Sequence, residues 1–514
     1  MKKYLLSLLL VGGALFTSCD MNQLAPGELQ DTESLQTVND AMLYRNNIYA
    51  SFRALCSGAY VTDVELEMDH FVGVIGNGSR GQNFSTAAIT SANGDIADNY
   101  YGCYSVMKNI NFLISEGEGI LANGNLNDAD KEDMQRYLGE AHYFRAFIYY
   151  WLYDHYCQAY DPARADQAGL GLQIVTKYNP TGIPAEWPGR SSMKASFDLI
   201  NGDLETAFNY LKEYETTVSD AQCTPDASYL SSYAVAATQA RIALLQKNYT
   251  EAIAKANYVI DSKIFALATG NSYLNMWSKD TSDELIFVPF VDAAESAYVG
   301  SFLDAWAYTS SYPTRVDYVP TLATYEMYGD TDIRQEAFFK WQRRMNIEGE
   351  TVNAYIFFKY PGNSSLVSGA DEYKNKPKPL RLSEQYLILA EAAAESGNAS
   401  LANSALTTLR MARISDYDQS TYYSGSALID EVRLERDREL IGEGFRMSDL
   451  RRWNLGFTRD GSSWEPTSSI ADFYILSNVN VAFVPGDYRY VWPIPSDEMQ
   501  TTPALAGQQN PGYN

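Results

Sequence analysis

Residues 434–453, LERDRELIGEGFRMSDLRRW, constrain the fold of this chain more than any other segment. Ten of these twenty residues are charged, too many for an ordinary core helix, yet apolar residues still recur at helical spacing. Gly442 and Gly444 interrupt the helical pattern, and residues 445–453 are predicted to form a second short helix. Charges patterned this densely across a break predict an ion-pair network that holds the two helices together.

The same segment resembles a motif of the SusD/RagB-like outer-membrane nutrient-binding lipoproteins. The matching positions are Glu435, Arg436, Glu439, Leu440, Glu443, Gly444, Arg446, Asp449, Leu450, Arg452 and Trp453. Four further segments resemble family motifs and follow in the family's order. They are GEAHYFRAF at 139–147, GLQIVT followed by RSSM within 171–193, RLSE through AEA within 381–392, and YVWPIP with the terminal QNPGY within 490–513. The resemblance covers nearly the whole chain.

This resemblance implies a mostly α-helical fold, with four tetratricopeptide-like helix pairs and an irregular, loop-rich ligand-binding portion with few short strands. It also implies a glycan-binding protein at the cell surface, without catalytic activity. Such a protein would deliver oligosaccharide to a SusC-like TonB-dependent transporter in the outer membrane. Capture of peptides or other nutrients by the same lid mechanism is the alternative within the family.

The periodicity of the chain independently predicts helices. Apolar side chains recur three to four residues apart in residues 38–55, 96–114 and 134–156. The last of these is apolar on two neighbouring faces, which predicts a helix buried in the middle of a bundle. Two segments look like tetratricopeptide-type hairpins, and residues 191–213 are predicted to add a helix to the same array. The hairpin segments are 229–253 and 381–409.

Two stretches depart from the helical pattern. Residues 58–94 are rich in Gly, Asn, Ser and Thr, and residues 270–380 carry strand-like runs such as 285–290 and 355–360 among long loops. Loops on a rigid scaffold often hold binding residues. The ligand site is therefore predicted in the loops of residues 58–101 and 270–380, with 270–320 favoured in the second stretch.

The amino terminus predicts export and lipidation. Lys2 and Lys3 precede an apolar run over residues 4–16, and Cys19 follows closely. This pattern is typical of a lipoprotein signal peptide over residues 1–18, with Cys19 acylated as the anchor. The alternative is an ordinary signal peptide that happens to contain a cysteine.

The rest of the chain is predicted to be one large domain, residues 38–514, behind a polar tether at residues 19–37. Pro, Gly and Ser are scattered through the interior, so no linker is apparent. No other run approaches the roughly 18 apolar residues that a membrane-spanning helix needs. The predicted location is the outer membrane, with the body facing the cell exterior.

The net charge of the chain limits the classes of ligand and partner that it can bind. Its formal net charge is −25, and removal of residues 1–18 would take away Lys2 and Lys3 and bring the charge to −27. An acidic surface argues against nucleic acid and anionic lipid as partners. It argues less strongly against sulfated or uronic polysaccharides.

A metal centre or cofactor is not predicted. The three histidines, His70, His142 and His155, show no ligand spacing, and the last two lie on one predicted buried helix. The many Asp residues leave a structural Ca²⁺ open, but no EF-hand-type loop is present.

Cysteines other than Cys19 are Cys56, Cys103, Cys157 and Cys223, and none has CxxC spacing. Export would permit a disulfide, whose connectivity the sequence does not reveal. Each cysteine also fits a predicted helix as a small buried hydrophobe, which is the preferred interpretation.

Catalysis finds little support. Glu439, Glu443 or Arg446 could serve as catalytic groups, but charge patterning on helices is usually structural. No nucleophile elbow or Cys/His pair is recognisable. A secreted glycosidase with two spatially paired carboxylates is the alternative from another class.

Residues 76–81 read GNGSRG, which matches the spacing G-x-G-x-x-G. A dinucleotide site would need a helix directly after it, and residues 82–86 do not show a helical pattern. We therefore predict a flexible loop, in which Asn77, Arg80 and Asn83 offer hydrogen-bonding groups.

Aromatic residues give the strongest indication of a ligand. The chain has 39 Tyr, and several aromatic residues cluster in one loop-rich region. Sugar rings pack their C–H faces on aromatic rings, whereas their hydroxyls need Asn, Asp and Arg partners. Trp306 and Tyr308 are the leading stacking candidates, and Asn77 and Arg80 the leading hydroxyl partners. Further candidates are Tyr101, Trp277 and Tyr312.

Overall fold

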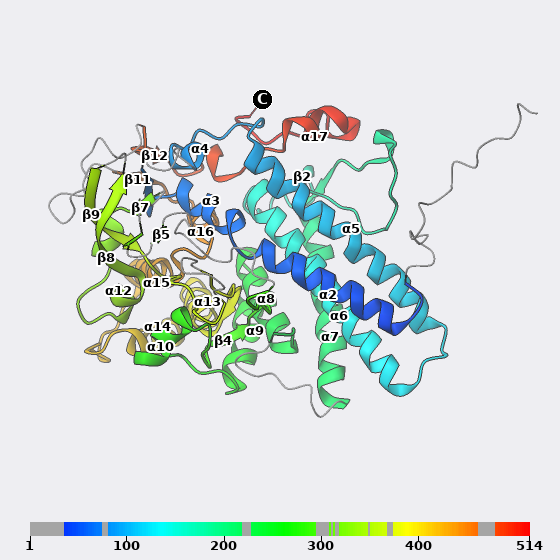
Figure 1. Cartoon of the computed structure of the whole chain (residues 1–514), viewed down its shortest axis with the longest axis horizontal. Helices are drawn as coiled ribbons and strands as arrows, with labels where there is room; N and C mark the ends of the chain where they lie inside the picture. Colours follow the sequence, from blue (N-terminus) through cyan, green and yellow to red (C-terminus); the bar gives the residue numbers. More distant parts are fainter. Residues whose placement is uncertain are drawn as a thin grey trace, which may run out of the picture.

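The structure is a computed structural model. It describes residues 35–74, 81–217, 228–294, 308–309, 312–313, 318–347, 350–366, 374–460 and 478–513. These residues are mostly helical, and their strands form short two-stranded antiparallel sheets (Figure 1). The predicted fold class is therefore confirmed. Within the same residues, no helix is long and apolar enough to cross a membrane.

Four long helices form one side of the molecule (Figure 1). They are α2 (Val38–Leu55), α5 (Gly94–Ala122), α6 (Asp128–Tyr156) and α7 (Met193–Thr217). The helix α6 packs against the other three, and its residues 137–156 are buried without interruption. This confirms the helix predicted from two apolar faces. Side-chain caps at Thr37, Asn93 and Asn127 begin three of the four helices.

Two helical hairpins lie beside this layer, as predicted. The first joins α8 (Ser232–Leu245) to α9 (Tyr249–Asp261), and the second joins α13 (Leu382–Glu395) to α14 (Ala399–Arg413). Both use the same turn, in which a residue with positive φ precedes an Asn that caps the next helix. The first has Lys247 at φ 59° before Asn248, and the second has Gly397 at φ 81° before Asn398. The helices α13 and α9 also pack together, so the hairpins form one array.

The remaining helices are short except for α15. They are α3 (Ala59–Glu67), α4 (Gln82–Ser85), α10 (Gly270–Ser278), α11 (Leu322–Glu326), α12 (Ile333–Phe338), α15 (Gly425–Leu440), α16 (Arg446–Trp453) and α17 (Ser496–Thr501), with the 3₁₀ turns η3 (Pro184–Glu186), η6 (Tyr488–Tyr490) and η7 (Pro503–Leu505).

The strands pair antiparallel, two by two. The pairs are β1 (Phe71–Gly73) with β7 (Tyr318–Pro320), β2 (Ala168–Gln173) with β3 (Arg190–Ser192), β4 (Leu285–Phe287) with β10 (Leu380–Arg381), β5 (Tyr308–Thr309) with β6 (Tyr312–Pro313), β8 (Phe339–Ile347) with β9 (Glu350–Phe357), and β11 (Phe457–Arg459) with β12 (Val481–Phe483).

Two sequence predictions for residues 58–94 are corrected here. The helix α3 lies in a stretch without helical periodicity, because Asp63 to Glu67 are all buried and no polar face alternates with them. Residues 82–86 were predicted not to be helical, yet Gln82–Ser85 form one helical turn after Gly81, whose φ is 67°. The loop predicted at residues 76–81 lies largely outside the described residues.

Candidate functional site

The break between the two charged helices has the predicted form. The helix α15 ends at Leu440 and α16 begins at Arg446. Gly442 and Gly444 have φ of 75° and 84°, in the left-handed region that favours glycine. Across the break, Arg436 Nε of α15 donates to Asp449 Oδ2 of α16 at 2.8 Å, so an ion pair joins the two helices.

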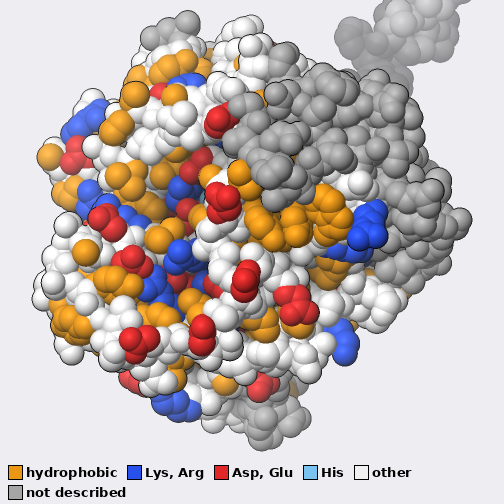
Figure 2. All heavy atoms as spheres, turned by 90° about the vertical axis from the view of Figure 1, so that its left-hand side faces the viewer, with side chains coloured by type: hydrophobic (Ala, Val, Ile, Leu, Met, Phe, Trp, Pro, Cys, Tyr) orange, Lys and Arg blue, Asp and Glu red, His pale blue; other side chains and the backbone are white. Residues whose placement is uncertain are grey.

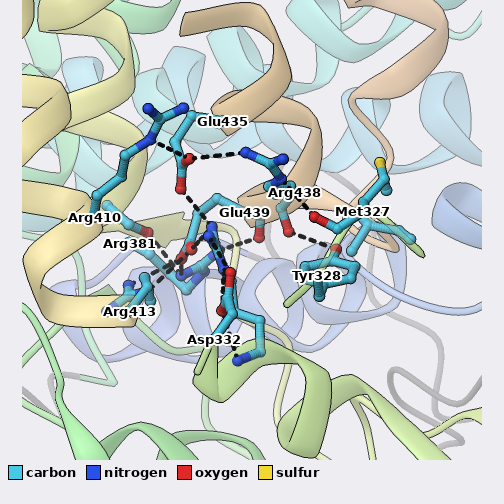
Figure 3. Close-up of polar contacts among 12 residues, drawn as sticks. Met327, Tyr328, Asp332, Arg381, Arg410, Arg413, Glu435, Arg438 and Glu439 are labelled. Carbon is cyan, nitrogen blue, oxygen red and sulfur yellow. Dashed lines mark hydrogen bonds and ion pairs between the residues drawn. The ribbon is translucent and has the colours of Figure 1, made fainter. Parts of the chain in front are cut away.

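Glu439 is at the centre of a larger buried network (Figure 3). Its Oε1 accepts from Arg381 Nη1 at 2.8 Å and from Arg413 Nη2 at 2.9 Å. Its Oε2 accepts from Arg413 Nε at 3.0 Å and from Arg334 Nη1 at 3.2 Å. The network therefore ties α15 to α12, to the start of α13 and to the end of α14.

The charges in this network balance. Its acids are Glu284, Asp332, Glu431, Glu435, Glu439 and Glu443, and its bases are Arg334, Lys359, Arg381, Arg410, Arg413 and Arg438. Six negative groups thus face six positive ones. Burial alone would raise the pKa of Glu439, but the surrounding guanidinium groups hold it well below its usual range. A carboxylate held ionised in this way cannot act as a general acid.

Arg446 is also paired. Its Nη2 and Nε donate to Asp69 at 2.6 Å and 2.8 Å, and its Nη1 lies 3.1 Å from Asp437 Oδ2. Glu443 accepts from Arg381 Nη2 at 2.6 Å and from Lys359 Nζ at 2.7 Å. The predicted ion-pair network is confirmed. Glu439 and Glu443 belong to it, and Arg446 forms separate ion pairs with Asp69 and Asp437.

The predicted ligand stretches meet at the β1–β7 pair. Phe71 pairs with Pro320 and Gly73 pairs with Tyr318, so residues of the stretches 58–101 and 270–380 lie side by side. Thr321 N also donates to His70 O at 2.8 Å, which extends the contact by one residue. The pairing fixes the ends of two loops that are far apart in the sequence.

The structure describes only some of the predicted ligand residues. Asn77, Arg80 and Trp306 lie outside the described residues. Tyr308 and Tyr312 lie on the paired strands β5 and β6, where Thr309 faces Tyr312. Asn83 is exposed on α4, and Tyr101 is 39 % exposed on α5.

Trp277 requires a correction. It was a candidate for stacking on a sugar, but its side chain on α10 is 1 % exposed. Lys359 Nζ lies 4.6 Å and Arg381 Cζ 5.1 Å from its ring centroid, so cations of the buried network cover it. Trp277 is a core residue in this structure.

A partly exposed aromatic surface that the sequence did not reveal lies on α11, β8 and β9. We call Tyr325, Trp341 and Tyr355 the aromatic platform. Trp341 and Tyr355 are cross-strand partners with ring centroids 5.0 Å apart, and Tyr325 stacks on Tyr355 at 4.4 Å. Trp341 is 37 % exposed. The strand β8 also contacts β6, which carries Tyr312. Figure 2 shows hydrophobic side chains gathered on the side of the molecule that includes β8 and β9.

The other titratable candidates are structural. His142 Nδ1 lies 2.7 Å from Asp203 Oδ1, and His155 stacks on Trp151 with centroids 3.9 Å apart. Burial lowers the pKa of His155 to about 4, so the ring is neutral near pH 7. In the part of the chain that the structure describes, no group of three or more His, Cys, Asp or Glu residues could hold a metal ion.

The thiols follow the preferred interpretation where they are described. Cys103 and Cys157 are buried, Cys56 is half-buried, and all three are unpaired. Burial raises the pKa of each, which keeps the thiols protonated and unreactive. Cys19 and Cys223 lie outside the described residues.

Several solved structures share this architecture. A SusD superfamily protein from Bacteroides thetaiotaomicron aligns with a TM-score of 0.75 and 22% identity over 92% of this chain and 100% of its own. A SusD superfamily protein from Bacteroides vulgatus gives 0.72 and 19% over 93% and 100%. A SusD-like carbohydrate binding protein from Bacteroides vulgatus gives 0.74 and 20% over 92% and 98%. At these identities the similarity establishes the fold.

The helix pairs, short sheets and loop-rich portion together define a protein with the SusD superfamily fold. Residues 300–513 match the model of the SusD family. This match agrees with the resemblance predicted from the motifs within residues 381–392, 434–453 and 490–513. No curated protein matches the chain.

Proposed function

We propose that this protein is a lipid-anchored carbohydrate-binding protein of the outer cell surface. It would deliver oligosaccharide to a SusC-like TonB-dependent transporter. The observation that carries the proposal is the β1–β7 pairing, which joins the two predicted ligand stretches. The strand β7 also contacts β9, so this pairing lies beside the aromatic platform. One structure of the same fold is described as a carbohydrate binding protein, which supports this class of ligand.

The proposed site combines stacking rings with polar groups. Trp306 and Tyr308 would stack on sugar rings, and the Asn77 and Arg80 side chains would bind hydroxyls. Trp341 of the aromatic platform would extend the stacking surface. An aromatic ring suits a sugar because the C–H groups of the sugar pack on its face, while the hydroxyls at the sugar's edge need polar partners.

Binding without hydrolysis is the proposed activity. Of the charged groups that suggested catalysis, Glu439 and Glu443 are paired with arginine or lysine, and Arg446 is paired with Asp69 and Asp437. The test is to incubate pure protein with a panel of neutral polysaccharides, measuring retention in affinity gels and the formation of new reducing ends. Retention without new reducing ends would support the proposal. New reducing ends would indicate the glycosidase, and retention of peptides alone would indicate the alternative nutrient class.

Variants connect the binding to the proposed residues. One ring stacked on a base contributes about 1–3 kcal/mol, and we apply this scale to sugars. Trp306→Ala and Trp341→Ala should each weaken glycan binding by about tenfold or more without changing the circular dichroism. Tyr422→Ala is the matched control, because Tyr422 is 62 % exposed and lies outside the proposed site. Wild-type affinity in either Trp variant would remove that ring from the site.

A further inference from the structure

A concave surface lies between α5, residues 173–188 and the start of α17. We call it the α5 groove. It encloses roughly 570 Å³, within the range of small-molecule sites. Figure 1 places α5, β2 and α17 far along the longest axis from β8 and β9. The α5 groove is therefore separate from the aromatic platform.

Aromatic rings line the α5 groove. Tyr101 and Tyr104 come from α5, and Tyr178 and Trp187 come from the opposite wall. Tyr101 is 39 % exposed and Trp187 is half-buried, so both rings present part of their surface to solvent. The sequence predicts Tyr101 as part of the first site, whereas the structure places it among these rings.

Hydrogen bonds beneath the surface hold the opposite wall in place. Tyr104 OH donates to Gln173 O at 2.9 Å, and Asn111 Nδ2 donates to Val175 O at 2.7 Å. Gln173 Nε2 donates to Pro188 O at 2.9 Å, and Trp187 Nε1 donates to Thr181 O at 3.1 Å. Three prolines within residues 180–188 further restrict the backbone. A ligand would therefore bind to a surface that is already formed, at a low cost in ordering.

The charges at the α5 groove select against ions. Lys108 and Lys177 contribute two positive charges to the lining, and Glu186 and Glu498 contribute two negative ones. A phosphate or sulfate group would meet both carboxylates, and a polyamine would meet both ammonium groups. A neutral polyhydroxylated ligand uses both kinds of group, because each hydroxyl donates and accepts hydrogen bonds.

We infer that the α5 groove is a second binding site for a neutral oligosaccharide, formed by stacking on Tyr101 and Trp187 and by hydrogen bonds at the charged rim. The choice of a carbohydrate rests on the proposed function, and the location rests on the geometry. Two separate sites would allow one chain to hold a polysaccharide at two points and so increase its avidity.

Fluorine NMR tests the second site directly. The full mature chain is labelled with 5-fluorotryptophan, and its tryptophan resonances are assigned with Trp187→Phe and Trp341→Phe. The probes are maltoheptaose, xylohexaose and mannohexaose. We expect at least one of them to shift the Trp187 resonance in a saturable way. Tyr101→Ala should weaken this response about tenfold or more, whereas Tyr422→Ala should leave it unchanged.

The outcomes separate the two proposals. A shift of Trp341 with a fixed Trp187 for every saccharide would overturn the second site and leave the proposed function intact. A shift of Trp187 by a tryptic peptide mixture, but by no saccharide, would overturn the choice of carbohydrate at the α5 groove. If no saccharide shifts any resonance or produces heat in calorimetry, both proposals fail. Tyr101→Ala removes a partly exposed ring, so it keeps the test valid if Trp187 variants fold poorly.

Discussion

Glu439 has no exposed surface, yet it stays ionised because three guanidinium groups donate to it. Glu439→Gln would remove the negative charge and leave cations of the network without compensation. Breaking a buried pair on one side typically costs about 3–5 kcal/mol. We therefore expect a clear drop in the urea midpoint, measured by circular dichroism. The exposed pair Lys194–Asp198 offers a control, since Asp198→Asn should leave the midpoint unchanged. Equal midpoints for Glu439→Gln and wild type would contradict a stabilising role.

His70 should make stability depend on pH. Burial would lower its pKa, but Asp437, Glu65 and Asp69 outweigh burial and raise the pKa from 6.5 to about 10. The bound proton therefore stabilises the fold fully below pH 6.5, and this contribution is lost as the pH rises through 10. His70→Gln should lower the urea midpoint most at pH 6, and the difference from wild type should narrow toward pH 10. A difference that stays constant over this range would refute the assignment.

Individual residues also show which features of the site could be predicted from the sequence and which could not. The charge spacing of residues 434–453 predicted an ion-pair network because helical neighbours are set by local geometry. Its partners Glu284 and Arg334 could not be identified, because only the tertiary fold brings them to α15. Trp277 failed as a ligand candidate for a related reason, since sequence does not distinguish an exposed ring in an irregular region from a buried one.

At the scale of elements, the contact between α6 and α7 depends on a glycine. A Cβ at Gly139 of α6 would lie 2.9 Å from Tyr210 Cβ and 3.3 Å from Leu211 Cγ of α7. Overpacking typically costs about 1–3 kcal/mol, which exceeds the gain of about 0.5–1 kcal/mol from replacing a helical glycine. Gly139→Ala should therefore lower the thermal midpoint.

Gly202 provides the matched control for that variant. It lies within α7, and a Cβ there would have no neighbour within 4 Å. Only the gain in helix propensity applies, so Gly202→Ala should raise the thermal midpoint slightly. If both variants raise it, α6 and α7 pack less closely than the structure indicates.

Helices were predictable from the sequence where apolar residues recur on one face. They were not predictable where consecutive residues are all buried. The helix α2 and both hairpins follow the apolar spacing of the sequence. The short helix α3 does not, because five consecutive residues of it are buried. The strand β8 was also not predicted, because its charged residues interrupt the apolar pattern of a strand. Its pairing with β9 is what joins Trp341 to Tyr355. The aromatic platform depends on that pairing and so could not be predicted.

At the scale of the whole molecule, Cys19 should control membrane attachment. The lipoprotein signal pattern before this residue predicts that a lipid on Cys19 anchors the chain. Cys19→Ala should move the protein to the soluble fraction with an unchanged circular dichroism spectrum, because the predicted tether carries no core. The assay needs cells that lack the transporter, and membrane retention of the variant there would refute lipidation. Protease treatment of intact cells tests surface exposure.

The last prediction concerns the partner. A binding protein that is only tethered to a membrane cannot move a sugar across it. Only helices and closed barrels span a membrane, so a second protein must supply the pore. A lid on a barrel needs a broad and fixed contact face, which the array of helix pairs can provide. If the ligand loops face the mouth of the barrel, closure would trap the sugar between the two proteins. Gentle detergent extraction and pull-down through this chain should recover a much larger outer-membrane protein in near-equal amount. Recovery of this chain alone, under conditions that preserve other outer-membrane complexes, would count against the lid mechanism without affecting carbohydrate binding.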